Sequence, residues 1–217
     1  MSGELDTQKI RLIMQLRSEG ITDMRVLAAL ERVPRERFVP PSLAEHAYDN
    51  SALPIGRGQT ISQPFVVAYM TQMLDVHDDM TVLEIGTGTG YQAAVLAQFC
   101  RRVYTVERHR AILRDAEMRF AKLGVANITT RYGDGSQGWP EHAPYDRIMV
   151  TAGAPVVPPA LVEQLTEDGV MVLPIGRDPL AQELVRVRRT ADGHELEPLI
   201  GVRFVPLVAG DTDDDED

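Results

Sequence analysis

Cysteine is nearly absent from this sequence, since Cys100 is the single one among 217 residues. An intramolecular disulfide is therefore impossible, and we expect the chain to reside in the reducing cytoplasm. No run of about eighteen apolar residues occurs, and the first residues lack a basic region followed by an apolar stretch. These absences predict a protein with neither a membrane span nor a secretory signal.

Basic charge is also scarce, because 22 Lys and Arg residues face 32 Asp and Glu residues and leave a net charge of −10. Six of the acidic residues lie in the last seven positions, 211–217, so the rest of the chain carries only −4. We expect the 211–217 tail to be disordered and solvated. A body of this charge attracts phosphate backbones weakly, and no nucleic-acid partner is predicted.

The sequence has no internal repeat and no low-complexity linker, and 44% of its residues are hydrophobic. This composition predicts a single domain over 1–210. We divide the domain into an N-terminal helical cap with a substrate loop, 8–75, and a core with C-terminal strands, 76–208. In the cap, apolar residues recur at helical spacing within 8–17 and again within 26–33.

Strands and helices are expected to alternate through the middle of the chain. The expected strands are 81–85, 102–106, 128–131, 145–150 and 170–173, and the expected helices are 91–99, 111–123 and 159–165. This order predicts an α/β, Rossmann-like fold with a mainly parallel sheet and helices on both faces. Segments 183–188 and 196–206 lack a helical pattern and are expected to form an antiparallel C-terminal edge.

The strongest motif is segment 82–90, Val-Leu-Glu-Ile-Gly-Thr-Gly-Thr-Gly, in which an apolar strand runs into glycines that open a helix. Gly86, Gly88 and Gly90 allow a ligand to approach the backbone, and the helix start offers free N–H groups. The stretch also satisfies the relaxed dinucleotide pattern G-x-G-x-x-A, so the glycines alone leave NAD open. Glu84, as a fixed anion, would repel a pyrophosphate and suit a cationic amino group and sulfonium, which favours S-adenosyl-L-methionine.

Carboxylates also follow the next two expected strands. Glu107 ends the second strand, where a carboxylate can accept hydrogen bonds from two ribose hydroxyls; a surface charge is the plain alternative. Asp134, followed by Gly135, comes after the third strand and can meet an adenine amino group, although Asp-Gly is also a common turn. Because parallel strands end at one edge of a sheet, we expect these residues and Glu84 to form one nucleoside site.

These motifs resemble the class I S-adenosylmethionine-dependent methyltransferases. Within that class, segment 52–64, Ala-Leu-Pro-Ile-Gly-Arg-Gly-Gln-Thr-Ile-Ser-Gln-Pro, resembles the protein-L-isoaspartate O-methyltransferase family. Segments 33–40, 145–154, 173–176 and 202–207 resemble family signatures in order and spacing. The resemblance therefore covers about residues 8–208.

The resemblance implies a repair enzyme that methylates the free carboxylate of L-isoaspartyl residues in damaged proteins and peptides, and it leaves D-aspartyl residues open as a second substrate. S-adenosyl-L-methionine is the implied cofactor and S-adenosyl-L-homocysteine the product. Ser62 falls on the family's signature serine and is the implied catalytic and cofactor-contacting residue, with Thr60 as a second side-chain donor. Some members carry a histidine where Val67 stands, so that contact is not carried over. The rest of the implied substrate loop is Pro54, Ile55, Gly56 and Gly58.

Elementary chemistry supports an orienting role for Ser62. A free α-carboxyl with a pKa of about 3.5 is ionised at neutral pH, so the acceptor needs no general base. A sulfonium brings its own leaving group, which leaves the protein to align the reacting atoms and exclude water. The residues alone also allow a simpler role, in which Ser62 caps a helix that begins near Pro64.

Two further functions stay open from the sequence. One is a class I methyltransferase for another small molecule or for RNA, and the other is a nucleoside-binding module without catalysis. No serine hydrolase is expected, because the sequence has no G-x-S-x-G segment. The five histidines show no metal-ligand spacing, so no metal is predicted. We expect a monomer.

Overall fold

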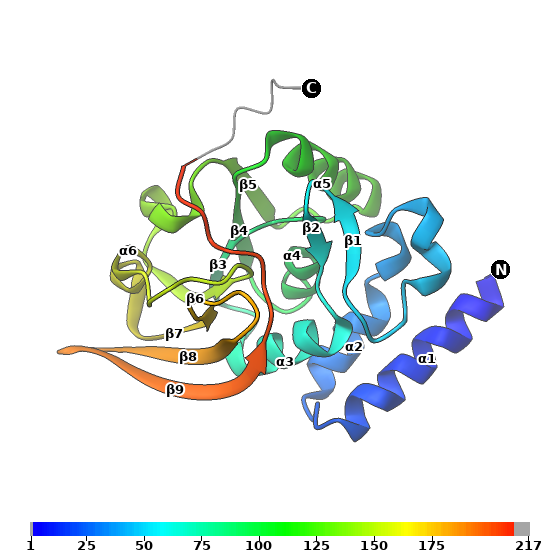
Figure 1. Cartoon of the computed structure of the whole chain (residues 1–217), viewed down its shortest axis with the longest axis horizontal. Coiled ribbons are helices and arrows are strands. Elements are labelled where there is room, and N and C mark those ends of the chain that lie inside the picture. The colour runs from blue at the N-terminus through cyan, green and yellow to red at the C-terminus, as the bar shows by residue number, and fades with distance from the viewer. Residues whose placement is uncertain (1, 211–217) are drawn as a thin grey trace.

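The structure, a computed structural model, describes residues 2–210, and the acidic tail expected over 211–217 lies outside this part of the chain. Its centre is a sheet with the strand order β5-β4-β3-β6-β7-β8-β9 (Figure 1). Strands β5 to β7 in this order are parallel. Strands β8 and β9 join antiparallel at one edge, which confirms the predicted fold class. The strands are β3 (Thr81–Ile85), β4 (Arg102–Glu107), β5 (Ile128–Tyr132), β6 (Tyr145–Val150), β7 (Leu165–Ile175), β8 (Gln182–Thr190) and β9 (Gly193–Val202).

Helices cover the two faces of the sheet unequally. Alternation along each strand sends Val82 and Met149 to one face, where they pack with the helices α3 (Pro64–Leu74), α4 (Tyr91–Leu96) and α5 (Arg110–Leu123) in one core cluster. Leu83 and Ile148 point to the other face and pack with Leu161 of α6 (Pro159–Glu163) in a second cluster. Two short 3-10 helices, η3 (Gly135–Gln137) and η4 (Pro140–His142), lie in the connection from β5 to β6. Burial on both faces explains why β3 has no exposed residue.

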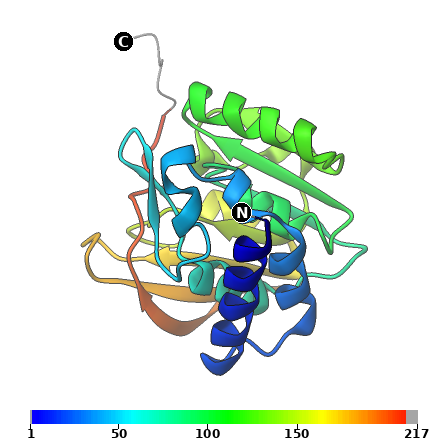
Figure 2. The same ribbon diagram turned by 90° about the vertical axis from the view of Figure 1, so that its right-hand side faces the viewer.

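The N-terminal cap consists of α1 (Ser2–Ser18) and α2 (Met24–Arg32), followed by the 3-10 helices η1 (Arg35–Arg37) and η2 (Pro41–His46). Figure 2 shows α1 and α2 side by side, and α2 also contacts α3 and α4. Asp23 caps α2, because its carboxylate accepts a hydrogen bond of 2.8 Å from the N–H of Arg25. Because α2 contacts α3 and α4, the cap packs against the helices that cover one face of the sheet.

The segment before α3, which the sequence assigns to a substrate loop, contains regular structure. It forms an antiparallel hairpin of β1 (Leu53–Gly56) and β2 (Gln59–Ile61), which is separate from the seven-stranded sheet. Gly56 and Gly58 have φ angles of 94° and 68°, and these left-handed conformations turn the chain within two residues. The strands are too short, and too rich in proline and glycine, to produce a recognisable strand pattern.

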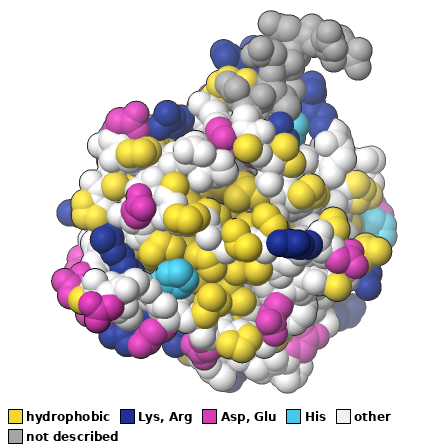
Figure 3. All heavy atoms as spheres, turned by 60° about the vertical axis from the view of Figure 1, so that its left-hand side comes forward, with side chains coloured by type: hydrophobic (Ala, Val, Ile, Leu, Met, Phe, Trp, Pro, Cys, Tyr) yellow, Lys and Arg dark blue, Asp and Glu magenta, His cyan; other side chains and the backbone are white. Residues whose placement is uncertain are grey.

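The open edge of the sheet at β9 carries charge. Glu197 of β9 forms an ion pair of 2.8 Å with Arg186 of β8, and Glu195 is exposed beside it. Figure 3 shows a neighbouring face on which hydrophobic side chains gather at the centre and charged side chains surround them. Charged side chains on an edge strand discourage pairing of that strand with another chain.

Candidate active site

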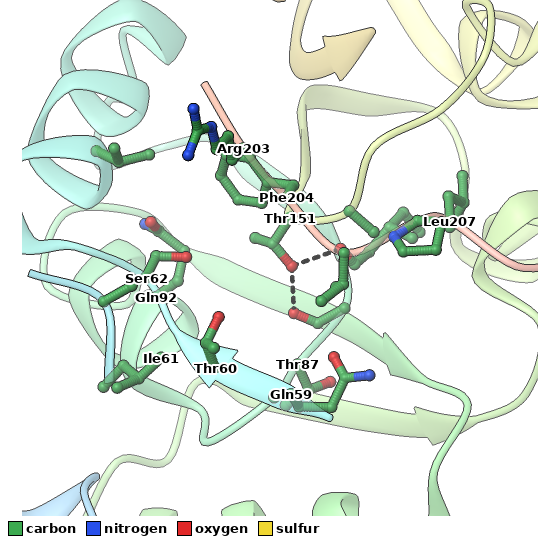
Figure 4. A pocket seen from close by; sticks show the side chains of 18 of the residues that line it. Gln59, Thr60, Ile61, Ser62, Thr87, Gln92, Thr151, Arg203, Phe204 and Leu207 are labelled. Carbon is green, nitrogen blue, oxygen red and sulfur yellow. Dashed lines mark hydrogen bonds between the residues drawn. The ribbon is translucent and has the colours of Figure 1, made fainter. Parts of the chain in front are cut away.

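A cleft of about 900 Å³ opens at the carboxyl ends of the parallel strands (Figure 4). One wall is the turn between β3 and α4, and a second is the hairpin with the residues that follow it. The third wall is residues 203–208, which we call the C-terminal segment. This position matches the general rule that open α/β sheets bind ligands at the carboxyl ends of their strands.

The predicted glycine turn adopts left-handed backbone conformations, with φ angles of 93° at Gly86, 52° at Gly88 and 88° at Gly90. Gly86 and Gly88 line the cleft, whereas Gly90 does not. A Cβ at Gly86 would lie 2.4 Å from Thr151 Oγ1, and a Cβ at Gly90 would lie 2.6 Å from the ring of Phe120. The first two glycines therefore belong to the cleft wall, and the third permits α4 to pack against α5.

Glu107 lines the cleft at the end of β4 and is only 6% exposed. Its Oε2 accepts a hydrogen bond of 2.9 Å from the N–H of Gly88, and its Oε1 accepts one of 3.0 Å from the N–H of His109. Two backbone donors thus fix the carboxylate. A carboxylate has about four lone-pair positions, so acceptor capacity remains for two hydroxyl groups of a ligand.

Glu84 differs from the fixed anion that the sequence suggested. Its side chain is completely buried on the face of the sheet that α3, α4 and α5 cover, and Glu84 is not among the residues lining the cleft. Glu84 Oε2 accepts a hydrogen bond of 2.5 Å from Thr105, its neighbour across β3 and β4, while Oε1 has no partner. Burial, and to a lesser degree the nearby Glu107, raises the pKa of Glu84 to about 8 against the favourable bond from Thr105. In the chain without a ligand, the carboxyl is therefore mainly protonated at neutral pH.

Asp134 caps η3 and does not line the cleft, whereas Gly135 does. One oxygen of Asp134 accepts a hydrogen bond of 2.8 Å from the N–H of Ser136, and the other accepts one of 2.8 Å from the N–H of Gly210. Burial raises the pKa of Asp134, but these hydrogen bonds outweigh it and leave the pKa below its ordinary value. A Cβ at Gly135 would lie 2.5 Å from Ile85, so this turn packs directly against the end of β3.

The substrate-loop residues predicted from the sequence divide into two groups. Gly58, Thr60 and Ser62 line the cleft, and Figure 4 shows Thr60 and Ser62 across from Thr87 and Thr151. The second group does not line it and forms the outer strand of the hairpin, which supports β2: Pro54, Ile55 and Gly56.

Ser62 does not cap the helix that follows it. Helix α3 begins at Pro64, its N-cap residue is Gln63, and the N–H of Phe65 in its first turn donates to the side chain of Asn50 and not to Ser62. The capping alternative left open by the sequence is therefore wrong. The backbone carbonyl of Ser62 accepts a hydrogen bond of 2.7 Å from Arg35, and its side chain is left to face the cleft.

Sequence reasoning missed several residues of the cleft wall. Thr151, after β6, donates a hydrogen bond of 2.7 Å to the carbonyl of Gly86 and holds the glycine turn. Gln182, at the start of β8, accepts a bond of 2.6 Å from the N–H of Phe204 and donates one of 3.2 Å to its carbonyl. Both residues are distant in sequence from the motifs. The quoted family segments 145–154 and 202–207 were the available signals.

Among residues 2–210, no helix is long and apolar enough to cross a bilayer. In the same part of the chain, no group of three His, Cys, Asp or Glu side chains is placed to hold a metal ion.

The sheet, the glycine turn and the carboxylate that ends β4 define the class, which is that of the Rossmann-like class I methyltransferases. The model of one family in this class, protein-L-isoaspartate(D-aspartate) O-methyltransferase, matches residues 7–212. The chain belongs to this family.

Curated relatives agree with this result. The protein-L-isoaspartate O-methyltransferase of Rhodospirillum rubrum is 60% identical over 206 residues, which cover 94% of both chains. The enzyme of the same name from Paramagnetospirillum magneticum is 59% identical over 202 residues, covering 93% of this chain and 94% of its own.

Solved structures agree as well. A structure of a protein-L-isoaspartate O-methyltransferase is 30% identical to this chain and has a TM-score of 0.82; the match covers 93% of this chain and 66% of that one. This chain thus spans about two thirds of the length of that solved protein. A Plasmodium falciparum protein, solved in complex with S-adenosyl-L-homocysteine, shares the fold with a TM-score of 0.79 at 24% identity, covering 91% of this chain and 97% of its own.

Proposed function

We propose that this chain transfers the methyl group of S-adenosyl-L-methionine to the free carboxylate of L-isoaspartyl residues in damaged proteins and peptides, leaving S-adenosyl-L-homocysteine. Membership of the family supports this function. The observation that carries it is the placement of Thr60 and Ser62 on one wall of the cleft that also contains Gly86 and Glu107. Hydroxyl groups that can donate to the carboxylate of the substrate, and groups suited to bind a nucleoside, thus face the same space.

The cleft fits the proposed cofactor. Its volume of about 900 Å³ lies within the range of small-molecule sites, and Gly86 and Gly88 in the turn have no side chain to keep a ligand from the backbone. Glu107 is proposed to accept hydrogen bonds from the ribose hydroxyls, and Gly135, which lines the cleft next to Asp134, is proposed to border the adenine. The contact expected between Glu84 and the amino group of the cofactor is not proposed, because Glu84 is completely buried and does not line the cleft.

The bound cofactor would supply an activated methyl group on a sulfonium centre. The protein's part is then to align a carboxylate that is already ionised, because its pKa of about 3.5 lies far below neutral pH. Thr60 and Ser62 would donate hydrogen bonds to that carboxylate and turn one oxygen toward the methyl group. Such alignment is worth up to about 7–11 kcal/mol in well-oriented reactions, so no general base is required.

Several finer features remain proposals. Activity on D-aspartyl residues rests on the family name alone. We propose that the acceptor is an extended segment of unfolded chain, because the hairpin wall is open to solvent at Gly58 and Thr60. The cytoplasmic location, the monomeric state and the lack of a nucleic-acid partner also stay predictions.

The test is transfer of labelled methyl from S-adenosyl-L-methionine to two synthetic peptides that differ at one residue, isoaspartate or L-aspartate. We expect label on the isoaspartyl peptide alone, in a base-labile ester, with Ser62→Ala as the matched enzyme of low activity. Label on neither peptide, with the cofactor still bound, would redirect the search to the alternative of another small-molecule or RNA acceptor.

A further inference from the structure

Arg35, in η1, is a completely buried cation outside the cleft lining. Within residues 2–210, no carboxylate forms an ion pair with it. Burial lowers the pKa of its guanidinium, although the neighbouring Tyr91 opposes this effect. A buried charge without a counter-ion costs folding free energy. Its contacts therefore need an explanation beyond stability.

The guanidinium connects three segments that are distant in sequence. Its Nε donates a hydrogen bond of 2.8 Å to the carbonyl of Ala47, and its Nη2 donates one of 2.7 Å to the carbonyl of Ser62. Its Cζ lies 4.7 Å from the ring centroid of Tyr91, the first residue of α4 and the residue directly after Gly90. One planar group thus links the helical cap, the substrate wall and the helix that follows the glycine turn.

Ser62 needs such support because of its position. It follows a two-stranded hairpin that is not part of the main sheet, and it precedes a helix whose N-cap residue, Gln63, makes no side-chain cap bond. Beyond Ser62, the chain is held by Asn50, whose side chain accepts a bond of 3.0 Å from the N–H of Phe65. At Ser62 itself, the bond from Arg35 holds the carbonyl group and, with it, the position of the Cα atom that carries the side chain. The hydroxyl is thereby kept at the cleft wall.

We propose that Arg35 is a positioning residue for methyl transfer: it holds Ser62 in the orientation that binds the acceptor carboxylate and ties that orientation to α4. The inference rests on the proposed function. A charged planar fork suits this task, because it bonds two carbonyl oxygens in fixed directions and stacks on a ring, which a lysine ammonium cannot do.

The test is a double-mutant cycle between Arg35→Met and Ser62→Ala, read as kcat and KM for an isoaspartyl peptide. Each single change should lower kcat/KM by about tenfold or more, since misplacement of about 1 Å can cost about 100-fold. In the Ser62→Ala chain, Arg35→Met should lower kcat/KM by less than about threefold, because the hydroxyl it positions is already absent. The affinity for S-adenosyl-L-methionine should stay within about twofold in all four chains.

Two further variants separate positioning from stability. Arg35→Lys keeps the charge and the stem, should fold, and should lose about as much kcat/KM as Arg35→Met. Arg147→Met is the matched control. Arg147 also donates to backbone carbonyls, those of Leu74, Asp75 and Asp146, and the first two lie at the opposite end of α3 from Ser62. Its loss should lower the melting temperature and leave kcat/KM close to that of the unaltered chain.

The outcomes are distinguishable. Losses that multiply in the double mutant, or an equal loss of kcat/KM in Arg147→Met at similar stability, would overturn the role of Arg35 while the proposed function stands. Full activity of Arg35→Lys would show that charge alone suffices and would overturn the positioning argument. Absence of any transfer to the isoaspartyl peptide by the unaltered chain would instead overturn the proposed function, and the inference with it.

Discussion

Replacement of Glu84 by Gln should make the stability of this protein less sensitive to pH. The folded chain holds the proton of Glu84 up to a pKa of about 8, whereas the ordinary value is 4.5. Between these values the folded state binds a proton that the unfolded state has released. The contribution of Glu84 to stability is therefore fully present below pH 4.5 and is lost as the pH rises through about 8.

The magnitude follows from the width of this interval. Each pH unit within it changes the free energy of unfolding by at most about 1.4 kcal/mol, so the whole interval amounts to about 5 kcal/mol. Glu84→Gln keeps an acceptor for Thr105 and has no proton to lose. The two chains should be nearly equal in stability at about pH 5, and the Gln chain should be the more stable by several kcal/mol at about pH 8.

Urea unfolding of the ligand-free chains at a series of pH values measures this difference. Glu167→Gln, at an exposed position on β7, controls for the general effect of removing one negative charge. If the free energies of unfolding of Glu84→Gln and of the unaltered chain differ by the same amount at every pH, the reasoning is refuted. It would mean that Glu84 is ionised in the folded chain and that a charge is held inside the sheet.

Four other substitutions test the site and its frame. Ser62→Ala should lower kcat for an isoaspartyl peptide by about 100-fold and leave the dissociation constant of S-adenosyl-L-methionine within about twofold; unchanged transfer would remove Ser62 from its proposed role. Gly90→Ala should destabilise the fold by about 2–4 kcal/mol in urea unfolding, because its Cβ would meet Phe120 at 2.6 Å and its φ is 88°. Gly58→Ala should cost only about 1 kcal/mol, because its Cβ would enter open space, and equal costs would contradict the packing argument. Gln182→Ala removes both hydrogen bonds to Phe204. It should raise KM for the peptide and lower the melting temperature only slightly, and kinetic and calorimetric measurements on the same variant would show both effects.

The sheet could be predicted from the sequence because its central strands are buried on both faces. Such strands consist of consecutive apolar residues, which are easily recognised. The expected strands 81–85 and 145–150 match β3 and β6 in both bounds. The edge was less well defined. The expected strand 196–206 is β9 from Gly193 to Val202, and the residues after it leave the sheet to bond with Gln182. No local pattern distinguishes a strand from an extended segment that crosses the ends of other strands.

The site was predictable where a motif and its position on a strand coincide, as at Gly86 and Glu107. It was not predictable where the three-dimensional path decides, as for Thr151, which reaches the glycine turn only because β6 lies beside β3. The environment of Glu84 shows a third limit. Strand alternation sends its side chain beneath the helices with Val82, so a residue next to the turn is a buried acid and not an exposed charge.

The C-terminal segment gives the site an unusual dependence on chain length. It follows all seven strands of the sheet in the sequence, yet it forms one wall of the cleft and is fastened to Gly153 and Gln182 by backbone and side-chain bonds. A chain that stops at Val202 retains every strand and helix but has a cleft with one side open to water. Shortened products would thus be compact but would have an incomplete cleft. Measurements of secondary-structure content or of resistance to proteolysis would not reveal the missing wall. For this fold, a full complement of strands is a poor guide to whether the working site is complete.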